Sequence, residues 1–447
     1  MKKNKKCTNS KTLKVFVGPH EIAGYYSNLV QGLQQINVDC DYITYSSNKF
    51  NYGGETKTPW LLKCSKSLSS IHNKHRSFIS KFTFSIPAKF LRHLWAWLAI
   101  FRYDVFIFAF GASLFRGNHD LIILKLLRKR VIANLAHGSE SRPPFMDGSY
   151  QTLDGKQQPS HLELLKLTQK KHRRVSRFDK YSQIIIGASS STSQFLKSKF
   201  INTLAMGIPF GESNQIADGD ICLSNKEPDA PIRILHCPSH PAVKGSFLVE
   251  KAIENLRTRG YKINLVLLKE KPHSEVIDEI KLCDFVVDQL YSDAPMAGFP
   301  TEAAWFGKPA IVGGYSLDYL KEFAPSNMLP PSKTCHPDEL QDTIEQFIRN
   351  PKERIQLGAQ AQEFVRTKWN QVEVAKRYLR LIRGDVPEDW WLVPSEIVYL
   401  EGAGQRVEIT KENIKGMVEL YGVESLHLKH HPTLEQACIE FAGIKTC

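Results

Sequence analysis

Apolar runs alternate with amphipathic stretches through most of the chain, a pattern that predicts strands connected by helices. Runs that predict strands occur at 13–17, 40–44, 104–110, 131–135 and 184–186, and again at 232–235, 263–268, 285–287 and 309–312. Strands that alternate with helices in this way form parallel sheets covered by helices on both faces. The pattern therefore predicts an α/β protein built from two doubly wound, Rossmann-like domains.

Changes in composition divide the chain into segments. Residues 1–12 are basic and lack apolar periodicity, so we expect a disordered lead-in. Residues 212–231 are polar and rich in turn-forming residues, which is typical of a linker between domains. The expected units are a first Rossmann-like domain at 13–215, a second at 232–383, and a small α+β appendage at 384–447. In the appendage we expect a strand that ends at 408–409, a helix at 410–420, a strand at 426–428 and a final helix that starts at Thr433.

One stretch, residues 284–312, contains a complete strand–loop–helix–strand unit. Ligands of parallel α/β sheets bind outside the carboxyl ends of the strands. The helix start at Thr301 and Glu302 lies at such an end, and Lys244 closes a loop at the same edge of the same sheet. A lysine at that edge can hold an anion. The helix macrodipole also favours an acid in a first turn, so Glu302 fits a helix-start charge as well as a ligand contact.

Two further loops follow predicted strands of the first domain. Gly24 precedes a helix, where backbone amides can hold a phosphate, although a plain helix-entry glycine fits equally well. The loop after 131–135 carries His137, Glu140 and Arg142. Such a cluster of imidazole, carboxylate and guanidinium groups directly after a strand indicates a catalytic loop. Within it, Arg142 can pair with a phosphate or with Glu140.

The charge of the chain favours an acidic partner. The 447 residues include 59 Lys and Arg against 46 Asp and Glu, for a net charge of +13. Residues 57–103 hold nine Lys or Arg and no Asp or Glu, with Trp and Phe interleaved. That mixture suits a surface lying on an anionic bilayer, and a solvated basic face over an ordinary core is the alternative. No nucleic-acid-binding motif accompanies the charge, so we expect no nucleic acid partner.

The nine cysteines stand apart, without CxxC pairs or zinc-like spacing to histidines. We therefore expect reduced thiols, no metal site and a cytosolic protein. Residues 1–17 lack the apolar core of a signal peptide, and no apolar stretch is long enough to span a bilayer. Together with the basic aromatic segment, these features predict a cytoplasmic protein that is at most peripheral on the inner face of a membrane.

Three segments resemble motifs of the family-4 retaining glycosyltransferases, which have the GT-B fold of two Rossmann-like domains. In that family a lysine ends a KG loop after the first strand of the second domain, as in HCPSHPAVKG at 236–245. A second motif, G-x-x-x-E-A-…-G-K-P, matches GFPTEAAWFGKP at 298–309. HGSESR at 137–142 resembles the HGSD-x-R loop of some members. The resemblance covers about residues 13–383 and leaves out the appendage.

The resemblance implies transfer of a sugar from a UDP- or GDP-sugar to a lipid-linked or cell-envelope glycan acceptor, without a metal or other cofactor. It implies that Lys244 holds the diphosphate, that Glu302 accepts hydrogen bonds from the ribose, and that His137 lies near the transferred sugar. A lysine and helix amides can stabilise the charge that gathers on the leaving diphosphate. The other residues implied in nucleotide-sugar binding are Ser239, His240, Gly298, Phe299, Pro300 and Thr301.

Two positions depart from the family pattern. Ala294 stands where the family has the first of two acids, with Asp293 one residue away, and Ser239 stands where the family has an arginine. Two other functions therefore stay open. One is a catalytically inactive GT-B scaffold that docks on membranes or partner enzymes, and the other is a sugar-nucleotide epimerase.

Overall fold

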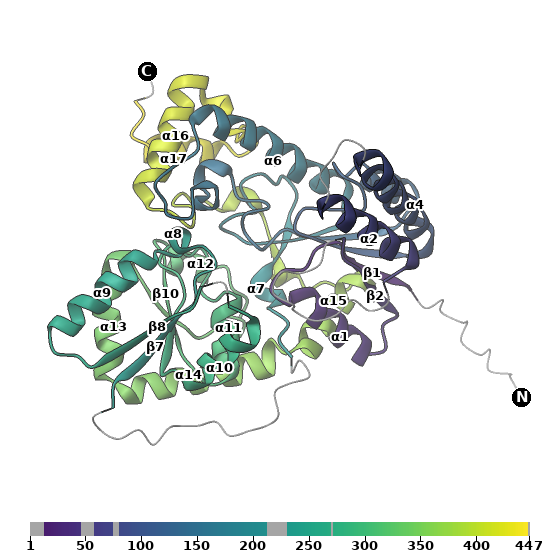
Figure 1. The fold of residues 1–447 in the computed structure, drawn as a ribbon. Coiled ribbons are helices and arrows are strands. Elements are labelled where there is room, and N and C mark those ends of the chain that lie inside the picture. The colour runs from purple at the N-terminus through teal and green to yellow at the C-terminus, as the bar shows by residue number, and fades with distance from the viewer. Residues whose placement is uncertain (1–12, 46–57, 75–79, 212–229, 270, 446–447) are drawn as a thin grey trace, which may run out of the picture.

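The computed structural model describes residues 13–45, 58–74, 80–211, 230–269 and 271–445. These residues form two α/β domains, each built on a sheet, and the C-terminal helices lie beside the first domain (Figure 1). The predicted lead-in at 1–12 and most of the predicted linker at 212–231 lie outside the described residues. The prediction of an α/β protein with two Rossmann-like domains, the GT-B arrangement, is confirmed.

The described strands of the first sheet lie in the order β12-β6-β5-β4-β3-β1-β2. They are β1 (Val15–Gly18), β2 (Cys40–Tyr42), β3 (Val105–Ala109), β4 (Arg130–Asn134), β5 (Ile184–Gly187), β6 (Phe200–Asn202) and β12 (Trp391–Leu392). Neighbours pair in parallel except for β12, which runs antiparallel to β6. From β1 the chain moves one way to β2 and the other way to β3, so a topological switch point lies between β1 and β3.

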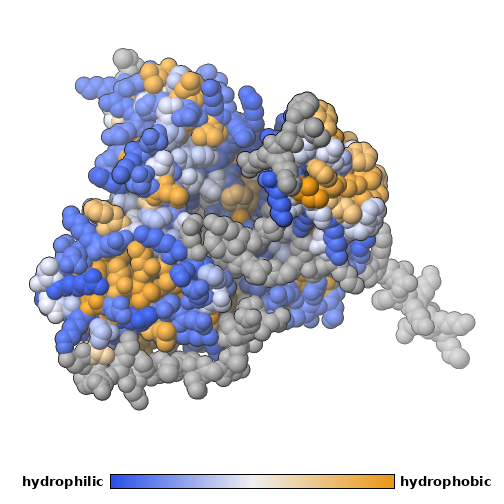
Figure 2. Space-filling model, viewed as in Figure 1, coloured by the Kyte–Doolittle hydropathy of each residue, from blue (hydrophilic) through white to orange (hydrophobic). Residues whose placement is uncertain are grey.

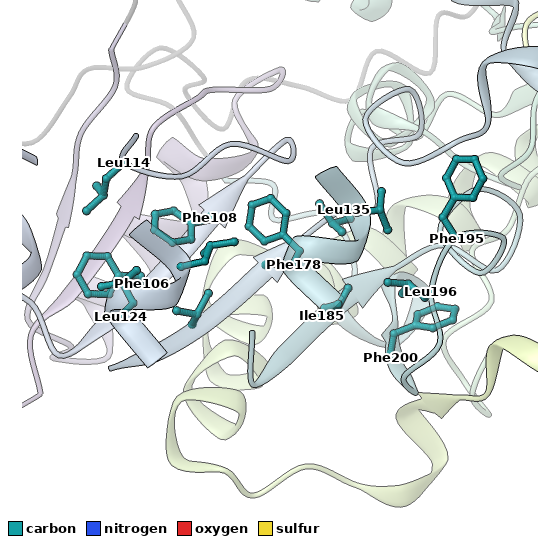
Figure 3. Close-up of a cluster of buried hydrophobic side chains, with 14 of the residues drawn as sticks. Phe106, Phe108, Leu114, Leu124, Leu135, Phe178, Ile185, Phe195, Leu196 and Phe200 are labelled. Carbon is teal, nitrogen blue, oxygen red and sulfur yellow. The ribbon is translucent and has the colours of Figure 1, made fainter. Parts of the chain in front are cut away.

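Alternate residues of each strand face opposite sides of the first sheet, so one strand serves two cores. Phe106 and Phe108 of β3 pack with α4 (Ile86–Arg102), α5 (Asp120–Leu126) and α6 (His161–Tyr181), as Figure 3 shows in part. Val105 and Ile107 face the other core, which includes α1 (Tyr25–Gln35) and α15 (Gln371–Arg383). This double burial explains why the run 104–110 is almost continuously apolar.

The second sheet has the order β11-β10-β9-β7-β8, and all its neighbours pair in parallel. Its strands are β7 (Ile232–His236), β8 (Ile263–Leu267), β9 (Phe285–Val287), β10 (Ala310–Gly313) and β11 (Lys333–Cys335). Helices α9 (Ser246–Thr258) and α13 (Leu340–Arg349) cover one face, and α10 (His273–Leu282), α11 (Gly298–Trp305) and α12 (Leu317–Lys321) cover the other. The switch point here lies between β7 and β9.

The chain returns to the first domain after the second sheet. Helix α14 (Pro351–Lys368) packs beside α11, and α15 then crosses back and packs against α1. The side chain of Asn370 caps α15 by accepting hydrogen bonds from the amides of Val372 and Glu373. The first domain is therefore completed by residues from far along the chain.

The predicted strands at 408–409 and 426–428 are wrong. Residues 408–409 belong to α16 (Val407–Tyr421), and η7 (Val423–Leu426) precedes α17 (Pro432–Phe441). Buried residues in α16 recur at helical spacing, at Thr410, Asn413, Ile414 and Met417. The helix predicted at 410–420 is therefore confirmed, and it begins three residues earlier than expected, at Val407. The appendage contributes one short strand, β12, to the first sheet, and its helices bury Ile414 and Met417 in the same core as Phe106.

Candidate functional site

A cavity of about 450 Å³ lies between the two domains, at the switch points of both sheets. Residues from the loops after β1, β4 and β5 line it on the first-domain side, and the loops after β7 and β9 line it on the second-domain side. Of the residues singled out in the sequence, those in its lining are His137, Arg142, Ser239, His240, Lys244, Asp293, Ala294 and Gly298. Those outside its lining are Gly24, Glu140, Phe299, Pro300, Thr301 and Glu302.

His137 follows β4 and is held by an aromatic cage. Its Nε2 and the Tyr26 hydroxyl share a hydrogen bond of 2.8 Å, and the rings of Tyr25 and Tyr26 meet the imidazole edge-on. Burial lowers the pKa of His137 to about 4, so the ring is neutral near neutral pH. A neutral imidazole fixed at a cavity wall can hydrogen-bond a hydroxyl group of a ligand.

Glu140 turns into its own loop instead of into the cavity. Its Oε1 accepts a hydrogen bond of 2.7 Å from the backbone amide of His137, and within the described residues its buried Oε2 has no partner. Burial raises the pKa of Glu140 to about 7. This carboxyl group shapes the loop that presents His137.

Arg142 joins the two domains across the cavity. Its Nη2 lies 2.5 Å from Asp293 Oδ2, in the second domain, and its Nη1 lies 3.4 Å from Asp147 Oδ1. Ser190 also donates a hydrogen bond of 3.0 Å to Asp293 Oδ2. Burial lowers the pKa of Arg142, but the two carboxylates outweigh it and raise that pKa overall. From the sequence, the expected partner of Arg142 was a phosphate or Glu140. Arg142 does not pair with Glu140, because the Glu140 carboxylate is bound to its own loop.

Asp147 also pairs with a second buried cation, Lys171. The Lys171 ammonium group, from α6, lies 3.6 Å from Asp147 Oδ2 and also contacts the Ser139 carbonyl. Burial lowers the pKa of Lys171 to about 8, although Asp147 opposes the shift. The loop 137–147 is therefore held by buried charges, of which Arg142 and Asp147 also line the cavity.

Lys244 stands at the switch point of the second sheet. It ends the short helix α8 (Pro241–Lys244), and its Nζ lies 3.1 Å from Oδ1 of the buried Asp288, which follows β9. His240 accepts a hydrogen bond of 3.4 Å from the amide of Val243 and so caps α8. Part of the Lys244 side chain stays open to the cavity, which makes it a cation that an anionic ligand can reach.

Helix α11 begins at Gly298, three residues before the start expected from the sequence, and Ala297 caps it without a side-chain hydrogen bond. Gly298 faces the cavity, whereas the Thr301 hydroxyl donates to the Ala297 carbonyl at 2.7 Å and is buried. The amide at the helix start is thus the part of this motif that the cavity exposes.

Glu302 lies one turn further along α11. Its Oε1 is 2.9 Å from His273 Nε2, and its carboxylate is mostly buried. Lys244 and Glu302 both act on Cys237. The pKa of that thiol is raised to about 11, mainly by burial, and Glu302 adds to the shift whereas Lys244 opposes it. The ammonium and the carboxylate therefore flank the same part of the sheet edge, although only Lys244 lines the cavity.

Residues 399–406, which we call the strap, form a third wall of the cavity that was not expected from the sequence. Ala403 and Gly404 of the strap line the cavity. The amide of Gly404 donates to the Tyr291 carbonyl of the second domain at 2.8 Å, and the Ala403 carbonyl accepts from Gly148 of the first domain at 2.9 Å. The spacing of glycines in the segment EGAGQ, 401–405, is the one signal in the sequence that marks this close approach.

Backbone packs directly on backbone where the strap meets the first domain. A Cβ atom at Gly148 would lie 1.9 Å from the Gly404 carbonyl oxygen. A Cβ atom at Gly404 would instead meet the second domain, 2.7 Å from Val243 Cγ1. Gly404 also has a left-handed φ of +72°, which favours glycine. Asp293, Ser190 and the strap are thus site elements that the linear motifs did not reveal, because they meet only in the folded chain.

No protein-family model matches this chain, and no curated protein sequence matches it. Among solved structures, HepE (Alr3699) of Anabaena in complex with UDP-glucose is similar, at 10% identity and a TM-score of 0.45, over 83% of this chain and 100% of that one. Sucrose-phosphate synthase of Thermosynechococcus elongatus is similar at 13% identity and a TM-score of 0.42, over 83% and 98%. Likenesses this distant concern the chain path alone, so the chemistry of the cavity has to be argued from its own residues.

Proposed function

We propose that this protein is a glycosyltransferase that binds a UDP- or GDP-sugar in the cavity between its domains. One observation carries the proposal: Lys244, the uncapped start of α11 at Gly298 and the neutral His137 face one cavity between two Rossmann-like domains. An ammonium group and a helix start favour a diphosphate. A neutral imidazole on the opposite wall suits a sugar hydroxyl.

The chemistry follows from where charge gathers. As the bond between the sugar and the diphosphate breaks, its electron pair moves to the leaving phosphate oxygen, and the sugar becomes oxocarbenium-like. Lys244 and the amide at Gly298 stabilise that leaving charge in place, so this scheme needs no metal ion or other cofactor. Transfer with retention of configuration, as in the family-4 glycosyltransferases that the motifs resemble, is part of the proposal.

Three further roles are proposed for residues at the site. His240 and Ser239 flank Lys244 and contact the diphosphate beside it. Glu302 accepts hydrogen bonds from the ribose, which requires its carboxylate to exchange His273 for the nucleotide. Because Arg142 is already paired with Asp293, it acts by holding the second domain against the catalytic loop.

A matched pair of lysine variants tests the donor site. Lys244→Ala removes the cation at the cavity, and we expect its kcat/KM with the preferred sugar nucleotide to fall by about a hundredfold or more. Lys251→Ala removes an exposed lysine from α9 of the same domain and should leave activity unchanged. The preferred donor is identified first, by measuring which nucleotide sugar the purified protein consumes. Full activity of Lys244→Ala would refute the assignment.

The acceptor is proposed to be a lipid-linked or cell-envelope glycan, reached from the cytoplasmic face of a membrane. Helices α2 (Trp60–Lys74) and α4, with η1 (Lys81–Ser85) between them, carry the apolar area at the right of Figure 2. Their exposed large apolar residues include Trp60, Phe82, Ile86, Phe90, Trp97 and Phe101. Basic residues and no acids accompany them, which suits an anionic bilayer. No helix among the described residues is long and apolar enough to cross a membrane.

Two exposed phenylalanines provide the membrane test. Phe101→Ser alters the surface of α4, whereas Phe247→Ser alters a similarly exposed site on α9 of the second domain. We expect co-sedimentation with anionic vesicles to weaken for Phe101→Ser only, and to fade with salt for the unaltered protein. Binding that ignores lipid charge and salt would discard the bilayer.

One observation favours a second function, a scaffold without catalysis. The acid expected at 294 is Ala294, and the nearest one, Asp293, is already bound to Arg142. Calorimetry against UDP and GDP separates the two functions, because a scaffold would bind neither. The donor assay without acceptor also detects an epimerase, which would convert the sugar nucleotide by itself.

A further inference from the structure

A second cavity, of about 440 Å³, lies between α6 of the first domain and the C-terminal segment around η7. It is separate from the interdomain cavity and shares none of its lining residues. Its lining consists of His172, Lys197, Glu424, His427, Lys429 and His430. Five of these six side chains are basic or can become so, an unusual lining for a cavity formed where two parts of a chain pack together.

Three imidazole rings are gathered at this cavity. The rings of His172 and His427 stack, with centroids 4.8 Å apart and planes 18° apart, and His430 lies 6.2 Å from His172. His427 has a left-handed backbone, at a φ of 57°, which is uncommon for a residue with a side chain. The fold thus accepts a small backbone strain where it brings His427 over His172.

The rings are neutral as they stand. The pKa of each of the three is lowered mainly by burial, and that of His172 falls to about 4. The positive charges of Lys197 and Arg173 and the neighbouring histidines, with His431 among them, contribute to these shifts, whereas the Gln194 backbone and Asp179 oppose the shift of His430. Burial and the nearby cations thus disfavour protonation of the rings, and an anion among the rings would favour it.

Some polar groups at this second cavity have no partner among the described residues. Nε2 of His430 is buried and lacks a hydrogen-bond partner in the described part of the chain, while the ring hydrogen-bonds the backbone of Gln194. Within the same residues, Lys197 and Lys429 form no ion pair. The carboxylate of Asp179 is occupied by the amides of Lys197 and Ser198, at 3.0 and 3.3 Å. Glu424 is the one acid in the lining.

We propose that this cavity binds the phosphate group of a phosphate monoester, between Lys197 and Lys429 and the three imidazoles. The two lysines and the protonated rings supply donors for the phosphate oxygens. The volume exceeds that of a bare phosphate and suits a small phosphorylated molecule. A metal ion fits less well, because no group of three His, Cys, Asp or Glu among the described residues is arranged to hold one. The proposal does not depend on the proposed function.

Calorimetric titration with glycerol phosphate is the direct test. Lys197→Ala combined with Lys429→Ala should weaken binding by about tenfold or more. Lys199→Ala is the matched control, since this exposed lysine is two residues away, pairs with Glu388 and lies outside the cavity. Lys244→Ala should bind as well as the unaltered protein, which separates this site from the interdomain cavity. The proposal is overturned if the double variant binds both glycerol phosphate and phosphatidic acid vesicles as well as the unaltered protein does, or if the unaltered protein binds neither.

The imidazoles predict a pH dependence with a fixed sign. Inorganic sulfate is the probe, because unlike phosphate it does not titrate near neutral pH. Without an anion the rings have lowered pKa values, and the negative charge of a bound anion raises those pKa values. Binding therefore takes up protons, and it tightens as the pH falls from about 8 to about 6. His427→Asn, which tolerates a left-handed backbone, should reduce the number of protons taken up. Proton uptake unchanged in that variant would show that the rings do not contact the anion.

The same phosphate chemistry can come from a lipid head group. Vesicles with and without phosphatidic acid, each tested with the Lys197→Ala and Lys429→Ala double variant, distinguish the two sources. A defect with glycerol phosphate assigns a soluble ligand, and a defect only with phosphatidic acid vesicles assigns a lipid phosphate.

Discussion

The two walls of the interdomain cavity differ in how their charges are held. On the first-domain wall, Glu140, Arg142, Asp147 and Lys171 are all buried and already engaged. Asp147 pairs with Arg142 and Lys171, Arg142 also pairs with Asp293, and Glu140 accepts from the His137 amide. On the second-domain wall, Lys244 keeps part of its side chain open to the cavity beside an uncapped helix start. The charged side chains of the first-domain wall hold a loop in shape, whereas the second-domain wall keeps a cation that a ligand can reach.

The largest expected effect comes from breaking the charge pairing of the first wall. Arg142→Ala leaves Asp293 and Asp147 without their shared cation in a buried place, and removing one partner of a buried pair costs about 3–5 kcal/mol. We expect a large drop in the urea midpoint of unfolding. The double variant Arg142→Ala with Asp293→Ala should cost less than the sum of the single changes. Additive costs would show that the two side chains do not interact across the cavity.

A pH-dependent effect should follow from Glu140, whose folded pKa of about 7 lies above its ordinary 4.5. The folded state therefore holds this proton more tightly, and the stability it contributes is full below about pH 4.5 and lost as the pH rises to about 7. At roughly 1.4 kcal/mol per pKa unit, the loss is on the order of 3 kcal/mol.

Glu140→Gln keeps an acceptor for the His137 amide and removes the titration. Relative to the unaltered protein, the variant should gain on the order of 3 kcal/mol in free energy of unfolding between about pH 5 and about pH 8. His137, whose pKa shifts in the other direction, is present in both proteins and cancels in the comparison. Parallel curves for the two proteins would mean that Glu140 titrates normally.

The strap joins the two walls of the interdomain cavity. Its effect on the cavity is tested by comparing Gly404, in the strap, with Gly422, outside it, because the two have nearly equal φ angles. Gly404→Ala, at a φ of +72°, introduces left-handed strain and a Cβ atom 2.7 Å from Val243 Cγ1. Gly422→Ala, at +76°, introduces the strain alone, because nothing lies within 4 Å of its Cβ position. We expect both to lose about 1 kcal/mol of stability, and Gly404→Ala to lose a further 1–3 kcal/mol, roughly, and to weaken donor binding. Equal donor KM values would show that the strap does not shape the cavity.

The fold followed from periodicity because the central strands of the two sheets are buried on both faces, so runs such as 104–110 and 285–287 carry their own signal. Lys244 and His137 were found because they lie in connections that leave the carboxyl ends of strands, and these ends of parallel strands converge. The Arg142–Asp293 pair joins residues 151 positions apart, and the strap reaches both domains from the C-terminal segment. No local pattern encodes such contacts. The helix predicted at 410–420 is present as α16, but its start at Val407 was mistaken for the end of a strand, because Val407 and Ile409 alternate with polar residues.

The smallest effect on stability is expected at the second wall, from Glu302→Gln. The pair with His273 is partly exposed on the histidine side, and pairs of this kind contribute about 0–1 kcal/mol, so the free energy of unfolding should change by less than about 1 kcal/mol. If Glu302 binds the ribose, the donor KM should nevertheless rise by about tenfold, because an amide replaces a charged acceptor. Steady-state kinetics with an acceptor in excess measures this, and His273→Gln is the control that removes the partner and keeps the carboxylate. A donor KM that rises equally in both variants would assign the effect to the position of α11, whereas a rise in Glu302→Gln alone would place the carboxylate against the nucleotide.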